Sequence, residues 1–195
     1  MLFYNQKVIT ALIMLLATAF TPLSLMAETQ SGVSSSIHNY AIPDVNVVRQ
    51  DGKKLNFIKE LDDGRPVILN FVFASCSAIC PMLSHTFSSV QTQLIKAGKP
   101  IHLISISIDP ENDTPATLAE YAQKFKAKHP TWDFYTGSME SSLSIQKAFD
   151  AYRGDKMNHS SVILMRAKPG KPWHRLEGFA TADKVMREYD TMLKD

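Results

Sequence analysis

The chain contains two cysteines, Cys76 and Cys80, which are separated by three residues. Two cysteines are too few for a disulfide scaffold, so the pair indicates either reversible thiol–disulfide chemistry or the binding of a soft metal ion. Three intervening residues folded into a turn can bring both sulfur atoms together, where they bond one ion or each other. The alternative is a buried, unreactive pair. The spacing alone does not separate redox chemistry from metal binding.

A third ligand is needed, because two sulfur atoms leave a metal ion under-coordinated. Of the six histidines, His159 is the best-placed candidate, since it directly precedes a predicted strand in a loop that can pack against the dithiol loop. The alternative for His159 is a loop histidine that only forms a cap or a hydrogen bond. His85 follows Cys80 by five residues and therefore projects from a different helix face. The remaining four are expected to be structural or solvent-facing: His38, His102, His129 and His174.

The dithiol lies between a predicted strand and a predicted helix. Val67–Phe73 is a continuous β-rich apolar run, which is typical of a strand buried on both faces of a sheet. From Met82 to Lys96, apolar residues recur at spacings of three and four, which predicts a helix. Ligand sites in open α/β sheets gather at the carboxyl ends of strands, and a helix amino terminus stabilises a thiolate. This loop therefore favours reactive sulfur.

The rest of the chain continues to alternate between strands and helices. Asp51-Gly52 separates two short β-rich segments and predicts a hairpin over Val45–Phe57. Asp113-Thr114-Pro115 supplies a capping residue followed by proline, which predicts the start of a helix through Lys126. The alternation predicts one α/β domain in which helices flank a central mixed sheet. Further strands are expected over Ile101–Asp109, Trp132–Thr136, Ser161–Met165 and Trp173–Phe179, and further helices over Ser141–Tyr152 and from Thr181.

The length and the charge restrict the classes of function. A chain of 195 residues suits one folded domain. With 21 Lys and Arg against 19 Asp and Glu, the formal net charge is +2 and no basic stripe stands out, which argues against a nucleic-acid partner.

The amino terminus is predicted to direct export. Val8–Phe20 is an uncharged apolar run behind Lys7, and a short stretch ending at Ala27 follows, which is the layout of a signal peptide. The run is shorter than the ~20 residues that span a bilayer comfortably, but with the apolar residues up to Met26 it can serve as an uncleaved anchor. We therefore expect a periplasmic domain, or one anchored in the inner membrane and facing the periplasm. The expected segments are a signal peptide or membrane anchor over 1–27, a Ser-rich tether over 28–39 and the folded domain over 40–195.

Taken together, the motifs resemble those of the Sco/SenC family, which are thioredoxin-fold copper chaperones for the assembly of cytochrome c oxidase. The resemblance covers most of the chain after Tyr40. The motifs that carry it are Cys-x-x-x-Cys-Pro at Cys76–Pro81, Asp-Pro-x-x-Asp-Thr-Pro at Asp109–Pro115 with Leu118 and Tyr121 after it, Thr136-Gly137, and His159-Ser160. The resemblance implies a thioredoxin-like fold with an N-terminal β-hairpin.

The same resemblance implies a function. Cys76, Cys80 and His159 would bind copper, as Cu(I) or Cu(II), and deliver it to the dinuclear copper centre of cytochrome c oxidase. The implied partners are the copper-bearing oxidase subunit, other copper chaperones and thioredoxin-like reductants, with membrane contact through an uncleaved N-terminal segment. The alternative is an extracytoplasmic thiol–disulfide oxidoreductase or redox sensor that acts on oxidase-subunit cysteines through a redox-active Cys76–Cys80 disulfide. Only that alternative would make the chain an enzyme.

Two positions depart from the family pattern. Ser77 stands where the family usually has proline, and Asn158 stands where it usually has aspartate. Losing that carboxylate can reduce charge compensation for Cu(II) or change the orientation of the imidazole. Asp109 ends a predicted strand at the same edge as the dithiol, so it either tunes the site or begins a turn. Met82 and Met157 can offer thioether sulfur, although methionine more often packs.

Overall fold

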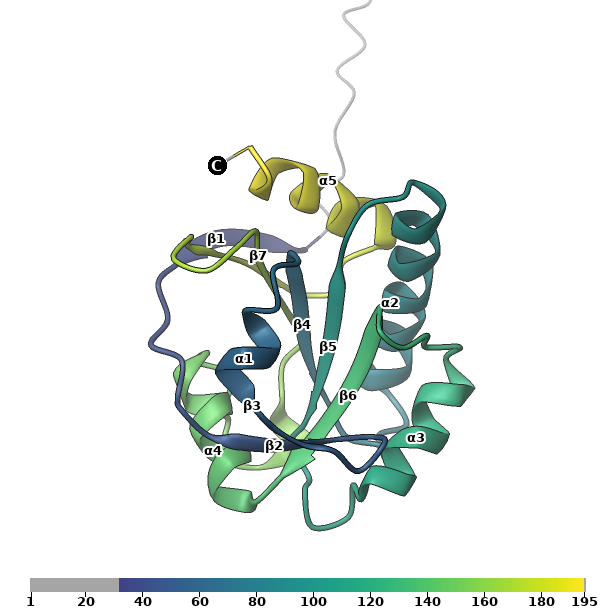
Figure 1. Ribbon diagram of the computed structural model, residues 1–195, viewed down its shortest axis with the longest axis vertical. Coiled ribbons are helices and arrows are strands. Elements are labelled where there is room, and N and C mark those ends of the chain that lie inside the picture. The colour runs from purple at the N-terminus through teal and green to yellow at the C-terminus, as the bar shows by residue number, and fades with distance from the viewer. Residues whose placement is uncertain (1–31, 195) are drawn as a thin grey trace, which may run out of the picture. The chain divides into compact units, whose positions relative to one another are not determined.

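The computed structural model describes residues 32–194, and Figure 1 shows their arrangement. The predicted signal peptide or membrane anchor over 1–27 lies outside the described residues. The strands are β1 (Ser34–His38), β2 (Asn46–Arg49), β3 (Lys54–Asn56), β4 (Val67–Val72), β5 (His102–Ser107), β6 (Trp132–Gly137), β7 (Val162–Arg166) and β8 (Trp173–Glu177). They form one eight-stranded sheet in the order β1-β8-β7-β4-β5-β6-β2-β3. The helices are α1 (Phe57–Leu61), α2 (Ile79–Lys96), α3 (Pro115–Lys124), α4 (Met139–Ala148) and α5 (Ala182–Met192), with a 3-10 turn η1 (Lys156–Asn158).

Helices pack on both faces of the sheet. Alternate residues of a strand point to opposite faces, and adjacent residues of β6 contact different helices. The Phe134 ring contacts Tyr121 of α3, whereas the Tyr135 hydroxyl donates to Glu60 of α1 at 2.6 Å. The prediction of an α/β fold with a central mixed sheet flanked by helices is therefore confirmed. The hairpin at Asp51-Gly52 is also present, as the antiparallel pair β2 and β3.

The register of the central strands brings three chain segments to one edge of the sheet. Strand β4 runs parallel to β5, with Val72 opposite Ser107, so both strands end at the same edge. Strand β7 runs antiparallel to β4, with Ile163 opposite Asn70, so β7 begins there. The loops that follow β4 and β5 and the loop that precedes β7 must therefore meet at this edge.

Part of the segment 28–39, which the sequence predicts to be a tether, is a strand, and residues 28–31 lie outside the described residues. Ser34–His38 forms the edge strand β1, in which Ser34 lies opposite Glu177 of β8. Small polar residues lack the apolar alternation that signals a strand, but their main-chain groups pair with β8 all the same. Gly178, which has φ +103°, follows β8, and a Cβ placed on it would lie 2.5 Å from the carbonyl oxygen of Gly32. The chain thus enters the sheet in close contact with Gly178, at a position that requires glycine.

Two predicted helices begin earlier in the chain than expected. Helix α2 begins at Ile79 rather than at Met82, because Pro81 lies in its first turn, where a proline's missing N–H costs no helical hydrogen bond. Helix α4 begins after Ser138, whose side chain caps it by accepting from the Ser141 N–H at 3.1 Å. It ends at Ala148 rather than at Tyr152, since Asp150 has φ +49°. Among residues 32–194, no helix is both long enough and apolar enough to cross a membrane.

Candidate metal centre

Cys76, Cys80 and His159 come together at the sheet edge where β4 ends and β7 begins. One ligand atom from each residue lies within 4.8 Å of the other two. The Cys80 thiol donates to His159 Nε2 at 3.4 Å, although the two residues are 79 positions apart in the sequence. Two sulfur atoms and one imidazole nitrogen thus surround a single point.

The two cysteines lie in different environments. Cys76 is partly exposed in the loop after β4, whereas Cys80 is fully buried in the first turn of α2. Partial burial raises the pKa of Cys76. Hydrogen bonds from the backbone N–H groups of Ala78, Ile79 and Cys80 and from the Cys80 thiol lower it by more. The pKa of Cys76 therefore lies below that of a free cysteine. Burial raises the pKa of Cys80 well above that of a free cysteine. Cys76 is therefore the more acidic of the two thiols and the one that more readily forms a thiolate.

The orientation of the His159 ring follows from its hydrogen bonds. His159 Nδ1 lies 2.7 Å from the carbonyl oxygen of Lys156, which can only accept, so Nδ1 carries the proton. Nε2 then presents its lone pair toward the Cys80 sulfur. The Phe73 ring also contacts the imidazole edge to face, at 5.2 Å between ring centroids. The imidazole is thereby set in the tautomer that binds a metal through Nε2.

Asp113 is a supporting residue that the sequence did not reveal. It is buried and accepts from the Ala74 N–H at 3.1 Å and from the Ser107 hydroxyl at 2.6 Å. These bonds tie the start of the dithiol loop to the end of β5, and burial raises the pKa of the carboxyl group. Thr114, rather than Asp113, caps helix α3. The sequence signal for a separate role of Asp113 was the adjacent pair Asp113-Thr114, because only one of two neighbouring capping residues can cap the helix.

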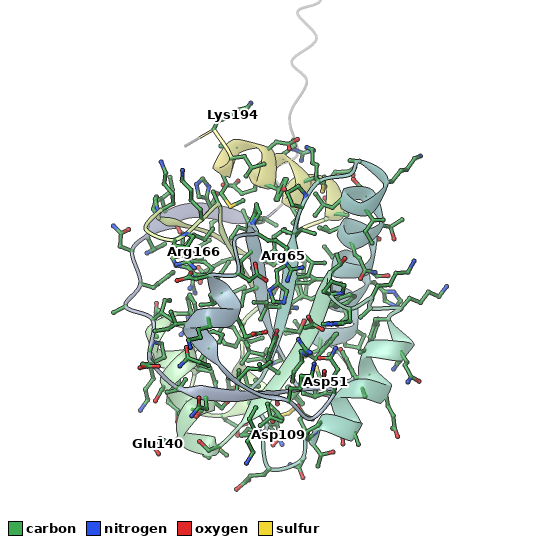
Figure 2. All side chains as sticks on the ribbon, in the orientation of Figure 1. Asp51, Arg65, Asp109, Glu140, Arg166 and Lys194 are labelled. Atoms are coloured by element: carbon green, nitrogen blue, oxygen red, sulfur yellow. The ribbon has the colours of Figure 1, made fainter. Side chains whose placement is uncertain are left out.

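Asp109 begins a turn, as one interpretation of its sequence position predicts, and it lines a cavity together with His159. Its carbonyl oxygen accepts from the N–H groups of Asn112 and Asp113, which forms the turn after β5. Its side chain is 4% exposed and accepts from the Lys156 ammonium at 2.6 Å. This cavity has a volume of about 430 Å³. In Figure 2, Asp109 lies at the lower end of the view. Arg166, the last residue of β7, lies in the upper part.

The other candidate side chains lie in various settings around the site. Met82 and Met157 are 55% and 71% exposed, so their thioethers face solvent rather than the core. Ser77 and Asn158, the two departures from the family pattern, are also exposed. The buried histidines, His102 and His174, pair with Asp63 at 3.0 Å and with Glu188 at 2.7 Å respectively, and are structural as predicted.

The difference between the two cysteines predicts which one reacts first. Near neutral pH, iodoacetamide should modify Cys76 of the reduced native protein roughly tenfold or more faster than Cys80, because the thiolate is the nucleophile and a tenfold change in thiolate fraction corresponds to one pKa unit. Peptide mapping by mass spectrometry after brief labelling measures this. Denatured protein is the control, in which both cysteines should react at similar rates. Faster labelling of Cys80 in the native protein would contradict the assignment of the thiolate.

The fold and the site together define a thioredoxin-like protein in which two thiols and one imidazole converge. A family model described as SCO1/SenC matches residues 41–194, and the chain belongs to this family. The SCO1 protein homolog of Bacillus subtilis (strain 168) is 31% identical over 140 residues, which is 68% of this chain and 72% of that relative.

Solved structures give the same result for the fold. BsSco, described as a member of the Sco family of cytochrome c oxidase assembly proteins with a disulfide switch, is 27% identical with a TM-score of 0.68, covering 82% of this chain and 96% of BsSco. Arabidopsis thaliana ScoI with copper bound is 23% identical with a TM-score of 0.66, covering 82% of this chain and 99% of ScoI.

Proposed function

We propose that this chain binds copper as cargo and serves in the assembly of cytochrome c oxidase. The observation that carries the proposal is the convergence of Cys76, Cys80 and His159, whose ligand atoms lie within 4.8 Å of one another. Membership of the SCO1/SenC family supports it, as does the description of BsSco as one of the cytochrome c oxidase assembly proteins. The copper held by Arabidopsis thaliana ScoI, which has the same fold, is further support.

The proposed ligands suit copper in both oxidation states. Cu(I) is soft and accepts two thiolates and one imidazole in a low-coordinate arrangement. Cu(II) favours additional nitrogen or oxygen ligands, such as water, which the partly exposed side of Cys76 can admit. Binding requires both cysteines to be deprotonated, so Cys80 releases its proton when the metal arrives. The raised pKa of Cys80 therefore makes loading depend on pH.

The proposed site also permits release of the ion. It is built from the loop after β4, the first turn of α2 and the loop before β7, and the cavity of about 430 Å³ opens beside His159. A ligand from a partner can approach Cys76 while Cys80 still holds the ion, so that copper is passed by stepwise ligand exchange. We propose the copper-bearing oxidase subunit, with its dinuclear copper centre, as the recipient, and other copper chaperones as donors.

The place of action is part of the proposal. The apolar run ahead of Ala27 has the layout of an export signal or anchor, so the domain is proposed to act outside the cytoplasm, in the periplasm, free or held at the inner membrane. A membrane-bound oxidase would then be within its reach.

A second candidate function is thiol–disulfide exchange with oxidase-subunit cysteines, kept reduced by a thioredoxin-like reductant. The asymmetry of the dithiol favours it, because a partly exposed thiolate at Cys76 can attack and a buried Cys80 can then resolve the mixed disulfide. An insulin-reduction assay distinguishes the two functions. Reduction of insulin at a rate near that of thioredoxin would favour the exchange function.

The test of the proposed function is the copper content of the reduced chain. We expect one Cu(I) per chain after anaerobic loading and removal of free metal, and sulfur-to-metal charge-transfer absorption after loading with Cu(II). Protein whose thiols have been alkylated in denaturant and then refolded is the control for adventitious binding. Failure of the reduced wild-type protein to retain copper above that control would overturn the proposal.

A further inference from the structure

We infer that Lys156 and Asp109 form a latch that holds His159 against the dithiol, an inference that rests on the proposed copper site. The Lys156 ammonium donates to Asp109 Oδ2 at 2.6 Å, and the two residues are 47 positions apart. Asp109 follows β5, whereas Lys156 lies in η1, just before His159. The pair therefore joins the loop that carries the histidine to the sheet edge that carries the dithiol.

Lys156 acts on the ligand through its main chain. Its carbonyl oxygen accepts from His159 Nδ1 at 2.7 Å and from the His159 N–H at 3.3 Å. Whatever fixes Lys156 therefore fixes both the position of His159 and the proton on Nδ1. The ammonium of Lys156 also lies 5.7 Å from the centroid of the Phe73 ring, which contacts the His159 ring edge to face. Lys156 thus contacts the imidazole directly through its carbonyl oxygen and indirectly through the Phe73 ring.

Asp109 is a rigid anchor for this lysine. Its side chain is buried, and both carboxylate oxygens also accept from the Asn112 side-chain amide, at 3.0 and 3.1 Å. Its N–H donates to the Ser107 hydroxyl at 3.0 Å, which ties it to the end of β5. An ion pair with a buried, immobilised carboxylate holds its partner far better than one between two mobile surface side chains.

The rest of the loop has few other connections. The hydrogen bonds of the Asp155 and Asn158 N–H groups end on neighbouring residues of the same loop. In the described part of the chain, the Lys156–Asp109 pair is the hydrogen bond or ion pair that ties residues 152–158 to the sheet. Nearby, Arg153 pairs with Asp150 at 3.6 Å, but the Asp150 side chain is 83% exposed. Arg153 is thus a cation in the same loop that has no buried anchor.

The experiment compares five variants with the wild-type chain. Lys156→Met and Asp109→Asn each break the latch, the double variant completes a mutant cycle, and Lys156→Arg restores the charge. Arg153→Met is the matched control, because it removes a cation from the same loop. Thermal unfolding establishes that each variant is folded. The readouts are Cu(II) affinity by chelator competition, the electron paramagnetic resonance spectrum of the Cu(II) form, and amide hydrogen exchange of residues 155–161 without metal.

We expect Lys156→Met to weaken Cu(II) binding about 10–100-fold, as is typical when a group that orients a metal ligand is lost. Its Cu(II) spectrum should change and the exchange of the His159 amide should quicken. Asp109→Asn should do the same, the double variant should be no worse than either single one, and Lys156→Arg should resemble the wild type. Lys156→Met values equal to those of Arg153→Met in all three readouts would overturn the inference. Wild-type protein that binds no copper would instead overturn the proposed function, and the metal-free exchange rates would still decide the latch.

Discussion

Replacement of Cys80 by serine is expected to abolish copper retention by the reduced protein. Cys80 is fully buried and its sulfur lies 3.4 Å from His159 Nε2, so it is the central ligand of the proposed set. A serine hydroxyl occupies nearly the same space but stays protonated at neutral pH and is too hard a ligand for Cu(I). We expect the Cu(I) affinity to fall by more than about a hundredfold, since even groups that only orient a ligand contribute 10–100-fold. Equilibrium competition with a Cu(I) chelator measures the change.

Two further variants make that result specific. His159→Ala should also lose affinity, whereas Met157→Leu should bind like the wild type, because the Met157 thioether faces solvent. Unfolding transitions show whether the buried substitution leaves the fold intact. A Cys80→Ser protein that is folded and still holds one Cu(I) at wild-type affinity would contradict the assignment of Cys80 as a ligand.

Oxidation is the second change expected to remove copper binding entirely. Joining Cys76 and Cys80 in a disulfide consumes both thiols, releasing two protons and two electrons to the oxidant, and leaves neutral sulfur that binds copper poorly. Protein treated with diamide should therefore retain no copper, and reduction with dithiothreitol should restore the full amount. The measurement is metal content per chain alongside a count of free thiols.

The control for oxidation is the Cys76→Ser variant, which cannot form the disulfide within one chain. Its residual copper content, whatever the level, should not change after brief diamide treatment and gel filtration of the monomer. Oxidised wild-type protein that retains stoichiometric copper, with no free thiols detected, would refute the proposal that the thiolates hold the metal.

The sequence predicted the parts of the site that depend on local patterns. Apolar runs place Val67–Phe73 in a buried strand, and parallel strands end at a common edge, so the position of the dithiol loop follows from pattern and topology. His159 could be selected because it directly precedes a predicted strand, in a loop that can pack against the dithiol loop. These inferences need only the periodicity of the chain and the geometry of sheets.

The remaining features depend on contacts between distant segments. Asp113 and Thr114 have the same capping chemistry, and the choice between them is made by the Ala74 N–H and the Ser107 hydroxyl, which need the buried carboxylate of Asp113. Strand β1 begins with three serines, whose side chains do not indicate a strand, and its main chain pairs with β8. The pairing of Lys156 with Asp109 likewise joins two loops that no local pattern relates.

The close approach of Gly32 to Gly178 has a practical consequence for handling this protein. The Gly178 N–H donates to the Ser161 carbonyl oxygen, and Ser161 is two residues from His159, so Gly32 and Gly178 lie close to the loop that carries His159. Helix α5, in contrast, reaches the opposite edge, where the Tyr189 hydroxyl donates to the carbonyl oxygen of Pro100, just before β5. A purification tag or electrode linker is therefore better fused after α5, at the edge of the sheet away from the proposed copper site.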